Sequence, residues 1–380
     1  MPISSSLPKV SIVIINLDGE KTLSSCLNSL GHIDYPKNRL EIILVDNGSK
    51  DDSLRLVRKT FPEVRVIENG QNLGFAVANN IGVKNCDGEL VAFLNNDARV
   101  EKSWLSELVK PVMRDDMVAS TGSKIFSWDG KTIDYGGGGT NFHGIAFKEG
   151  YREPDSKRFG YEKPVLFATG ASMLIYREVF LKAGGFDEDY FAYYEDIDLG
   201  WRLWILGYKV LYIPTSIAYH HHSRTSQRIG IEKLRVLHIR NPLYTIIKNY
   251  GQDVLDKILA AALLLSIKRT LLLARINDSS FRINPKDSFE SSFIRLWRKW
   301  PSFPLPKVAC SDLIAYSDVL SNLPKLLEKR KWIQNRRKRE DKDIFELFVN
   351  PHWSAESAEE YHSLQDLIEE WLGIKSLFSS

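Results

Sequence analysis

The sequence predicts an α/β fold, in which a mostly parallel sheet is flanked by helices and followed by a mainly helical C-terminal region. Continuous apolar runs of strand length occur at Val10–Ile15, Leu40–Val45 and Leu90–Leu94. Strands that are apolar on both faces belong inside a sheet covered on both sides. Helical patterns alternate with these runs through short connections, which is typical of parallel strands joined by right-handed crossovers.

The first part of the chain supplies four strands and the helices between them. We expect strands at Val10–Ile15, Leu40–Val45, Val64–Ile67 and Leu90–Leu94, and helices at Thr22–Leu30, at Asp52–Thr60 and from Asn72-Leu73-Gly74 through Asn85. The fourth strand is apolar throughout and is therefore expected inside the sheet.

Polar residues follow three of these strands. Asn16 follows the first, Asp46 the second and Asn95-Asn96-Asp97 the fourth. Open α/β sheets bind ligands at the carboxyl ends of their strands, so we expect a binding site there. Asp97 is a hard oxygen ligand that can hold a divalent cation against phosphates, and Asp46 can accept a hydrogen bond from the imide N–H of uracil or thymine. Each Asp also has a structural interpretation, as a helix cap or a turn residue.

Acids and histidines come later in the same region. Phe167–Ile175 is interpreted as a turn running into a strand, and Glu195-Asp196-Ile197-Asp198 opens a helix that runs through Leu206. A strand at Lys209–Ile213 then leads to His220-His221-His222. One neutral imidazole from this cluster can complete a metal site.

The three carboxylates have a structural interpretation and a chemical one. Acids in a first helical turn are favoured by the helix dipole, and Asp198 has the i,i+4 spacing of an ion pair with Arg202. However, an acid against aromatic rings, such as those of Tyr190–Tyr194, has a raised pKa and can serve as a general base. The residues alone leave both interpretations open.

Two common nucleotide-binding classes are not supported. Asn16-Leu17-Asp18-Gly19 lacks the glycine spacing of a dinucleotide fingerprint, and the chain contains no P-loop lysine motif. The sequence therefore favours neither a dehydrogenase nor a P-loop ATPase. The run Gly136–Gly139 follows no clear strand, and we expect it to be a flexible loop.

Composition and cysteine usage indicate a soluble globular protein of a reducing compartment. Hydrophobic residues make up 43% and charged residues 26% of the 380 residues. Cys26, Cys86 and Cys310 have no paired spacing, which argues against a disulfide framework or a zinc ribbon. Residues 1–9 lack the features of a signal peptide. We therefore expect a cytoplasmic protein.

Charge divides the chain into a domain at 1–230 and a helical C-terminal region at 231–380. The net charge is −2 over residues 1–230, +13 over residues 231–339 and −8 over residues 340–380. The second region is thus basic first and then acidic.

This basic segment has features of a membrane surface protein. Ile258–Ile267 is strongly apolar, but it is too short for a membrane span and is followed by Lys268-Arg269. It is either a core helix or a helix in a membrane interface. Tryptophan mixed with cations in Leu296–Trp300 and Lys331–Arg339 suits anionic headgroups. No nucleic-acid motif accompanies it, so we expect peripheral attachment to the inner face of the cell membrane and no nucleic-acid partner.

Taken together, these pieces resemble a family 2 glycosyltransferase of the GT-A fold, which is Rossmann-like. The matching features, in chain order, are Val10–Ile15, Val45–Ser49, Asn72–Asn80, Leu94–Asp97, Gly184–Asp187 and Glu195–Asp198. Each feature is weak alone, but the ordered combination is specific. The resemblance spans residues 9–225 and is greatest to the bacterial rhamnosyltransferase-like branch that acts on cell-surface glycans.

The resemblance implies an inverting transfer, in one displacement, from a nucleotide-diphosphate sugar that is UDP- or dTDP-linked. The acceptor would be a hydroxyl group of a cell-surface glycan or of a lipid-linked saccharide. Asp46 would hold the base, and Asn16, Asn72, Gly74 and Asn96 would lie near the nucleotide.

It also implies a divalent cation, Mg²⁺ or Mn²⁺, and a catalytic base. Asp97 matches the last position of the family's Asp-x-Asp metal motif, whereas the first position is Asn95, which removes one negative charge. His220 and the diphosphate would then supply more of the coordination. Asp196 matches the base that deprotonates the acceptor, with Glu195 beside it. The chemistry needs both a base for the nucleophile and a cation for the leaving diphosphate.

Two other classes of function fit the sequence less well. A catalytically weak scaffold that binds sugar nucleotides is suggested by Asn95, but the acids Asp97 and Asp196 and the histidine cluster favour an enzyme. A nucleotidyltransferase would need a basic, glycine-rich phosphate loop after the first strand, and the sequence has none there.

Overall fold

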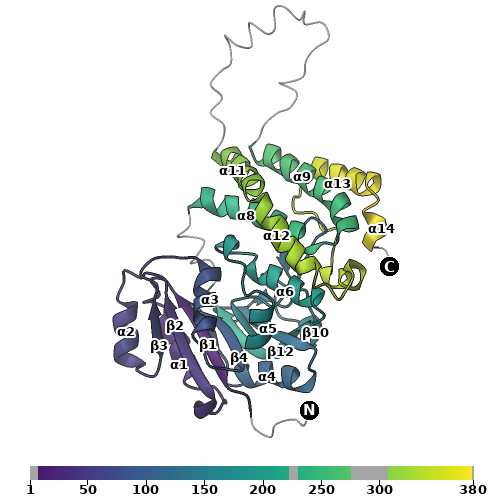
Figure 1. Cartoon of the computed structure of the whole chain (residues 1–380). Helices are drawn as coiled ribbons and strands as arrows, with labels where there is room; N and C mark the ends of the chain where they lie inside the picture. The colour runs from purple at the N-terminus through teal and green to yellow at the C-terminus, as the bar shows by residue number, and fades with distance from the viewer. Residues whose placement is uncertain (1–6, 222–229, 275–306, 379–380) are drawn as a thin grey trace, which may run out of the picture.

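The computed structural model describes residues 7–221, 230–274 and 307–378 (Figure 1). His222 and the Leu296–Trp300 segment lie outside these described residues. The strands are β1 Val10–Asn16, β2 Leu40–Asp46, β3 Arg65–Glu68, β4 Leu90–Asn95, β5 Ala98–Val100, β6 Val118–Ser127, β7 Ile133–Tyr135, β8 Gly138–Thr140, β9 Ala146–Lys148, β10 Lys163–Pro164, β11 Ser172–Tyr176 and β12 Lys209–His220. The α-helices are α1 Leu23–Leu30, α2 Ser53–Thr60, α3 Phe75–Lys84, α4 Trp104–Arg114, α5 Arg177–Lys182, α6 Glu195–Ile205, α8 Ile231–Asn249, α9 Gln252–Ala274, α11 Lys307–Ser321, α12 Leu323–Gln334, α13 Glu359–Trp371 and α14 Lys375–Phe378.

The main sheet follows the order β10-β12-β6-β11-β4-β1-β2-β3, with β5 paired to β12 and β7 paired to β6. Strands β3, β2, β1 and β4 are parallel, whereas β11 runs antiparallel to both β4 and β6. The α/β class, the flanking helices and the helical C-terminal region are confirmed, and the sheet is mixed. The parallel half brings the carboxyl ends of β1, β2 and β4 to one edge.

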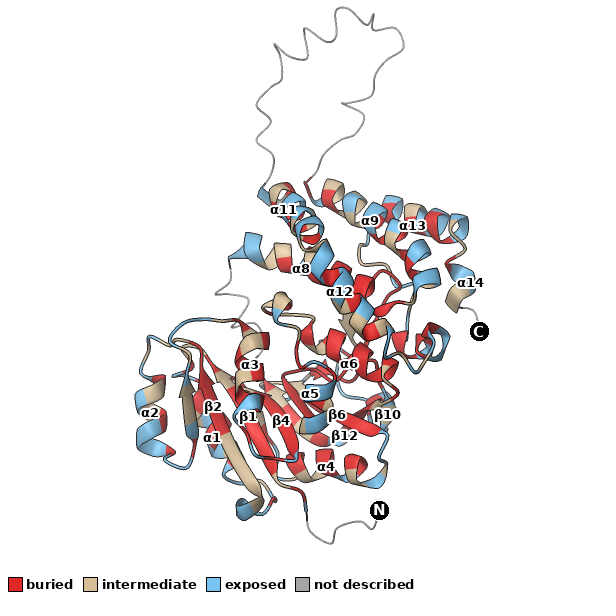
Figure 2. Cartoon of the chain, in the orientation of Figure 1, coloured by how far each residue is buried: buried red, intermediate tan, exposed pale blue. Residues whose placement is uncertain are grey.

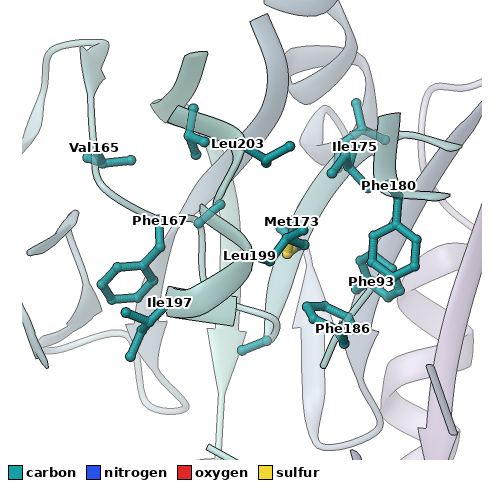
Figure 3. Close-up of a cluster of buried hydrophobic side chains, with 14 of the residues drawn as sticks. Phe93, Val165, Phe167, Met173, Ile175, Phe180, Phe186, Ile197, Leu199 and Leu203 are labelled. Atoms are coloured by element: carbon teal, nitrogen blue, oxygen red, sulfur yellow. The ribbon is translucent and has the colours of Figure 1, made fainter. Parts of the chain in front are cut away.

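The core lies on both faces of β4, as the apolar run predicted. Every residue of Leu90–Leu94 is at most 2% exposed (Figure 2). The Phe93 ring centroid lies 5.4 Å from that of Phe180 and 5.0 Å from that of Phe186 (Figure 3). Phe186 reaches this cluster because Gly184-Gly185 turns the chain with φ angles of 90° and 68°.

The Gly136–Gly139 run is not a flexible loop, so that prediction was wrong. All four residues are buried, and Gly138 and Gly139 belong to β8, which pairs with β9. A Cβ atom on Gly138 would lie 2.4 Å from the Phe167 ring, and one on Gly139 would lie 2.6 Å from the carbonyl oxygen of Phe348. The glycines therefore allow close packing against neighbours that are distant in the sequence.

The C-terminal helices pack next to α6 (Figure 1). The backbone N–H of Lys338 donates to the carbonyl of Ile205 at 2.8 Å, and the Arg339 guanidinium donates to the carbonyl of Gly207 at 3.0 Å. Part of the basic Lys331–Arg339 segment thus donates hydrogen bonds to backbone carbonyl groups at the C-terminal end of α6. The boundary at residue 230 stays a prediction.

Helix α9 has one buried face and one exposed face. Ile258, Ala261 and Leu265 are fully buried, as expected of a core helix, whereas Leu264 and Ile267 are 43% and 48% exposed. Within the described ranges, no helix combines the length and the apolar character that a bilayer span requires.

Candidate active site

A cleft opens at the carboxyl ends of β1, β2 and β4. Including the solvent at its mouth, it encloses about 870 Å³. The predicted residues Asn72, Gly74, Asn96 and Asp97 lie in its wall, whereas Asn16 and Asp46 do not. The full lining is Ile15, Leu17, Asp18, Gly19, Thr22, Asn47, Asn72, Gly74, Phe75, Asn95, Asn96, Asp97, Phe191 and Ala192.

Asp46 and Asn16 lie behind the cleft wall as a buried hydrogen-bonded pair. The Asn16 amide donates to Asp46 Oδ1 at 2.9 Å, and Asn16 Oδ1 accepts from the Asn96 amide at 2.9 Å. Asp46 Oδ2 accepts the backbone N–H groups of Gly48 and Ser49. The turn interpretation of Asp46 therefore describes its geometry, and its contact with a nucleotide base stays a prediction.

Gly74 sits where two loops meet. Its φ angle is +87°, and a Cβ atom would lie 2.6 Å from the carbonyl oxygen of Phe191. The Asn47 amide holds the same turn, because it donates to Asn72 Oδ1 and to the Gly74 carbonyl, each at 3.1 Å. The Asn72-Leu73-Gly74 motif therefore needs glycine both for its backbone conformation and for this close approach.

His220 lies between two aspartates. Its Nε2 is 3.1 Å from Asp97 Oδ1, and its Nδ1 is 2.9 Å from Asp134 Oδ2. Burial opposes the charge of His220, but the hydrogen bonds and charges of Asp134 and Asp97 raise its pKa to about 9. Burial likewise opposes the charge of Asp97, yet the hydrogen bond from His220 holds the pKa of Asp97 below its ordinary value. The structure thus brings together the two predicted metal ligands.

Asp97 and His220 are side chains of the types that bind divalent cations, but His220 can bind one only after it loses the proton that its raised pKa retains. A metal-ligating imidazole commonly gives its second ring nitrogen to a carboxylate, as His220 does to Asp134. In the described part of the chain, no group of three or more His, Cys, Asp or Glu side chains is placed to hold a metal. Asp97 and His220 would therefore share a cation with phosphate oxygens rather than enclose it alone.

The three acids at the start of α6 have different surroundings. Asp198 is fully buried and bonds Arg202 at 2.8 Å, which confirms the predicted pair. Asp196 is half-buried, and its two oxygens accept the N–H groups of Gly170 and Ile197, each at 2.9 Å. Glu195 is 6% exposed, and its Oε2 atom has no hydrogen-bond partner among the described residues.

These surroundings shift the pKa values of the three acids differently. Burial raises the pKa of Glu195 well above its ordinary value, and the neighbouring charge of Asp196 adds to the rise. Burial also raises the pKa of Asp196, but the N–H groups of Gly170 and Ile197 oppose that rise by stabilising the carboxylate. In Asp198, the charges of Arg202 and Lys248 outweigh burial and lower the pKa. Asp196 is therefore the acid whose pKa is raised while hydrogen bonds still stabilise its carboxylate form.

Asp134 and Phe191 are among the site residues that the sequence did not predict. Asp134 belongs to the three-residue strand β7 and meets His220 only through the sheet, so nothing local distinguishes it from a surface aspartate. Phe191 lines the cleft from the segment before the acids. The aromatic run at Tyr190–Tyr194 is expected from the sequence to surround the acids, and its member Phe191 also lines the cleft.

Comparison with known proteins identifies the domain. Residues 11–183 match the model of Glycosyl transferase family 2. This segment belongs to glycosyl transferase family 2. The chain is also similar to a mannosyltransferase structure from Pyrobaculum calidifontis in complex with GDP-Man and Mn²⁺, with 16% identity, a TM-score of 0.51, and 83% of this chain and 88% of that chain covered. This likeness agrees with the predicted GT-A fold.

Two relatives are named for O-antigen biosynthesis and for rhamnosyl transfer. The chain is 32% identical over 234 residues to the O-antigen biosynthesis protein RfbC of Myxococcus xanthus, which covers 59% of this chain and 18% of RfbC. It is 27% identical over 226 residues to an N-acetylglucosaminyl-diphospho-decaprenol L-rhamnosyltransferase of Mycobacterium tuberculosis, which covers 52% of this chain and 72% of that enzyme. The chain thus spans less than a fifth of the length of RfbC.

The family 2 match includes the cleft wall from β1 to β4 but ends before the acids of α6 and before His220. Both lie close to the matched segment in space, because β12 pairs with β5 directly after Asp97 and Gly170 bonds Asp196. The candidate site therefore extends beyond the segment that matches the family model.

Proposed function

We propose that the chain transfers a sugar from a nucleotide-diphosphate sugar, UDP- or dTDP-linked, to a hydroxyl group of a cell-surface glycan or a lipid-linked saccharide, with inversion at the anomeric carbon. The observation that carries the proposal is that one cleft contains Asp97, bonded to His220, and the Phe191-Ala192 wall that leads into Glu195 and Asp196. The residues proposed to bind the diphosphate are thus close in the structure to the acids proposed to transfer the proton. Rhamnosyl transfer is our first choice, since a relative is named for it.

In this proposal the cleft wall binds the nucleotide. Asn72, Gly74 and Asn96 line the cleft and offer amide and backbone groups to the base and ribose. Asp46 receives the imide N–H of the base only if the Ser49 hydroxyl, now 2.5 Å from Asp46 Oδ1, gives up that hydrogen bond. Asn16 would support Asn96 from behind through the 2.9 Å hydrogen bond between them.

Asp97 and His220 would hold the divalent cation, Mg²⁺ or Mn²⁺, and Asp134 would fix the imidazole with Nε2 toward Asp97. The bound cation would supply positive charge to the leaving diphosphate. Asn95 places a neutral amide 3.1 Å from His220 Nε2, so the protein contributes one carboxylate charge here. The Mn²⁺ in the mannosyltransferase structure supports the expectation.

Asp196 would act as the general base. It takes the proton of the acceptor hydroxyl while the acceptor oxygen forms a bond to the anomeric carbon and the bond from that carbon to the diphosphate breaks. The N–H groups of Gly170 and Ile197 keep the carboxylate oriented before the reaction. Burial favours the neutral form of Glu195, and that form would offer a hydrogen bond to the acceptor.

A membrane surface is the proposed place of action. Of the 18 large hydrophobic residues that are exposed among the described residues, 13 lie after residue 230, although this region is the smaller part of the chain. On α9 and α11 they include Leu264, Ile267, Leu313 and Ile314. Apolar side chains beside a segment of net charge +13 suit an anionic lipid interface.

A transfer assay tests the proposed function. Purified protein is incubated with a panel of UDP- and dTDP-sugars and with glycan or lipid-linked acceptors, with and without Mn²⁺, and the products are analysed by mass spectrometry and NMR. We expect one donor to give a product of inverted anomeric configuration in the presence of the cation. Tight donor binding without any turnover across the panel would favour the sugar-nucleotide-binding scaffold.

A further inference from the structure

The segment that leads into the acids has an unfavourable backbone. Phe191, Tyr193 and Tyr194 have φ angles of 63°, 66° and 75°. Residues with a Cβ atom adopt such angles only where surrounding contacts impose them. Phe191 lines the cleft and Tyr194 immediately precedes Glu195, so the contacts that hold this segment also set the shape of the site.

Those contacts come from the C-terminal helix α8. The fully buried Asn241 side chain points its amide nitrogen at three carbonyl oxygens of the segment, at 3.0 Å from Ala192, 2.8 Å from Tyr193 and 3.4 Å from Tyr190. From the other side, the N–H of Phe75 donates to the Phe191 carbonyl at 2.6 Å. Every carbonyl from residue 190 to residue 193 is therefore engaged.

Asn241 belongs to a polar stripe on α8. Thr245 and Lys248 follow it at helical spacing, and all three are at most 1% exposed. The Thr245 hydroxyl bonds the Tyr190 hydroxyl at 2.8 Å, and Lys248 pairs with Asp187 at 2.5 Å. Each polar side chain of this stripe forms a hydrogen bond or an ion pair with the segment around the acids. These interactions compensate for the burial of polar side chains on α8.

We propose that Asn241 is a positioning residue for sugar transfer, and that α8 is thereby a structural part of the active site. The inference rests on the proposed function, in which Asp196 is the base. Asn241 holds Ala192 and Tyr193 in the conformation that aims the start of α6 at the cleft. Its loss lets the segment relax toward negative φ angles and displaces Asp196 from the acceptor, while the nucleotide wall at Asn72 and Asn96 stays in place.

The experiment compares Asn241→Ala with Asn322→Ala in the full-length chain. Asn322 is the control, because among the described residues its half-buried side-chain amide donates within the C-terminal helices, to Asp318. We expect Asn241→Ala to lower kcat about 10- to 100-fold with little change in donor KM, as a displacement of catalytic groups does. Hydrogen exchange measured by mass spectrometry should rise in peptides covering residues 187–198 and remain unchanged around Asn72. Asn322→Ala should change neither quantity.

A rescue variant separates positioning from general destabilisation. Glycine accepts positive φ angles freely, so Tyr193→Gly added to Asn241→Ala should recover part of the lost kcat. If Asn241→Ala does not fold, the milder Asn241→Ser takes its place in each comparison.

Equal kcat and exchange in the Asn241 and Asn322 variants would overturn the inference, as would a loss confined to donor KM. A wild-type protein without transfer activity would defeat the proposed function. The exchange of residues 187–198 would then still decide whether Asn241 holds the segment.

Discussion

Replacing the proposed base gives the sharpest test of the site. Asp196→Asn keeps the side-chain shape and removes the charge. Its amide oxygen can accept one of the two N–H groups that Asp196 now binds, from Gly170 and Ile197, each at 2.9 Å. The other donor loses its acceptor, which costs about 1–3 kcal/mol, partly offset because a charge no longer has to be buried. We therefore expect a folded variant.

The effect on the rate should be far larger. Loss of a general base lowers rates by about 10²–10⁴-fold, which corresponds to roughly 3–5 kcal/mol of the activation barrier. Glu195→Gln should cost less than about tenfold, because Glu195 Oε2 has no hydrogen-bond partner among the described residues and the glutamine amide can still donate a hydrogen bond to the acceptor. Because burial raises the pKa of Asp196, the acid limb of the wild-type rate profile should lie above the ordinary aspartate range, with activity falling as the pH drops.

The assay measures single-turnover transfer and, separately, donor affinity by calorimetry. The expected pattern is an inactive Asp196→Asn with donor affinity within about threefold of the wild type. Transfer by Asp196→Asn together with an inactive Glu195→Gln that binds donor normally would refute the assignment and give the role to Glu195.

Three further outcomes follow from the structure. Asp97→Asn should weaken the Mn²⁺-dependent binding of UDP or dTDP by more than tenfold in calorimetry while leaving metal-free binding unchanged, and identical titrations would exclude Asp97 as a cation ligand. Lys248→Met should lower the free energy of unfolding by about 3 kcal/mol, since it leaves Asp187 with fewer partners in a buried site, whereas the half-exposed Lys325→Met should cost below about 1 kcal/mol; urea unfolding measures both. The wild-type advantage over Lys248→Met should be complete above about pH 4 and shrink as the pH falls, because Asp187 has a lowered pKa in the folded state. The protein should sediment with anionic vesicles at low salt and be released by high salt, and Leu264→Glu should weaken that binding; sedimentation that is absent at every salt concentration contradicts the membrane proposal.

Features that depend on neighbouring residues in the sequence, such as strands and the polar residues that follow them, could be predicted from the sequence. The apolar run Leu90–Leu94 was enough to place β4 in the centre of the sheet, and the polar residues after it reached the cleft because strand ends share an edge. Asp46 lies at the same edge, but its neighbours turn it inward, and only the packed structure reveals that. Asp134 and Asn241 were not foreseeable, since their partners lie on distant segments and depend on the completed tertiary structure.

The buried glycine hairpin has a consequence for biosynthesis. The Asn141 amide at its tip donates to the Trp353 carbonyl, 212 residues further along the chain, and Gly139 packs against Phe348. At synthesis rates of about 5–20 residues per second, these late partners emerge roughly 10–40 s after the hairpin. During that interval the nascent hairpin lacks these partners, so its final packing is expected only after residues 348–353 have been synthesised.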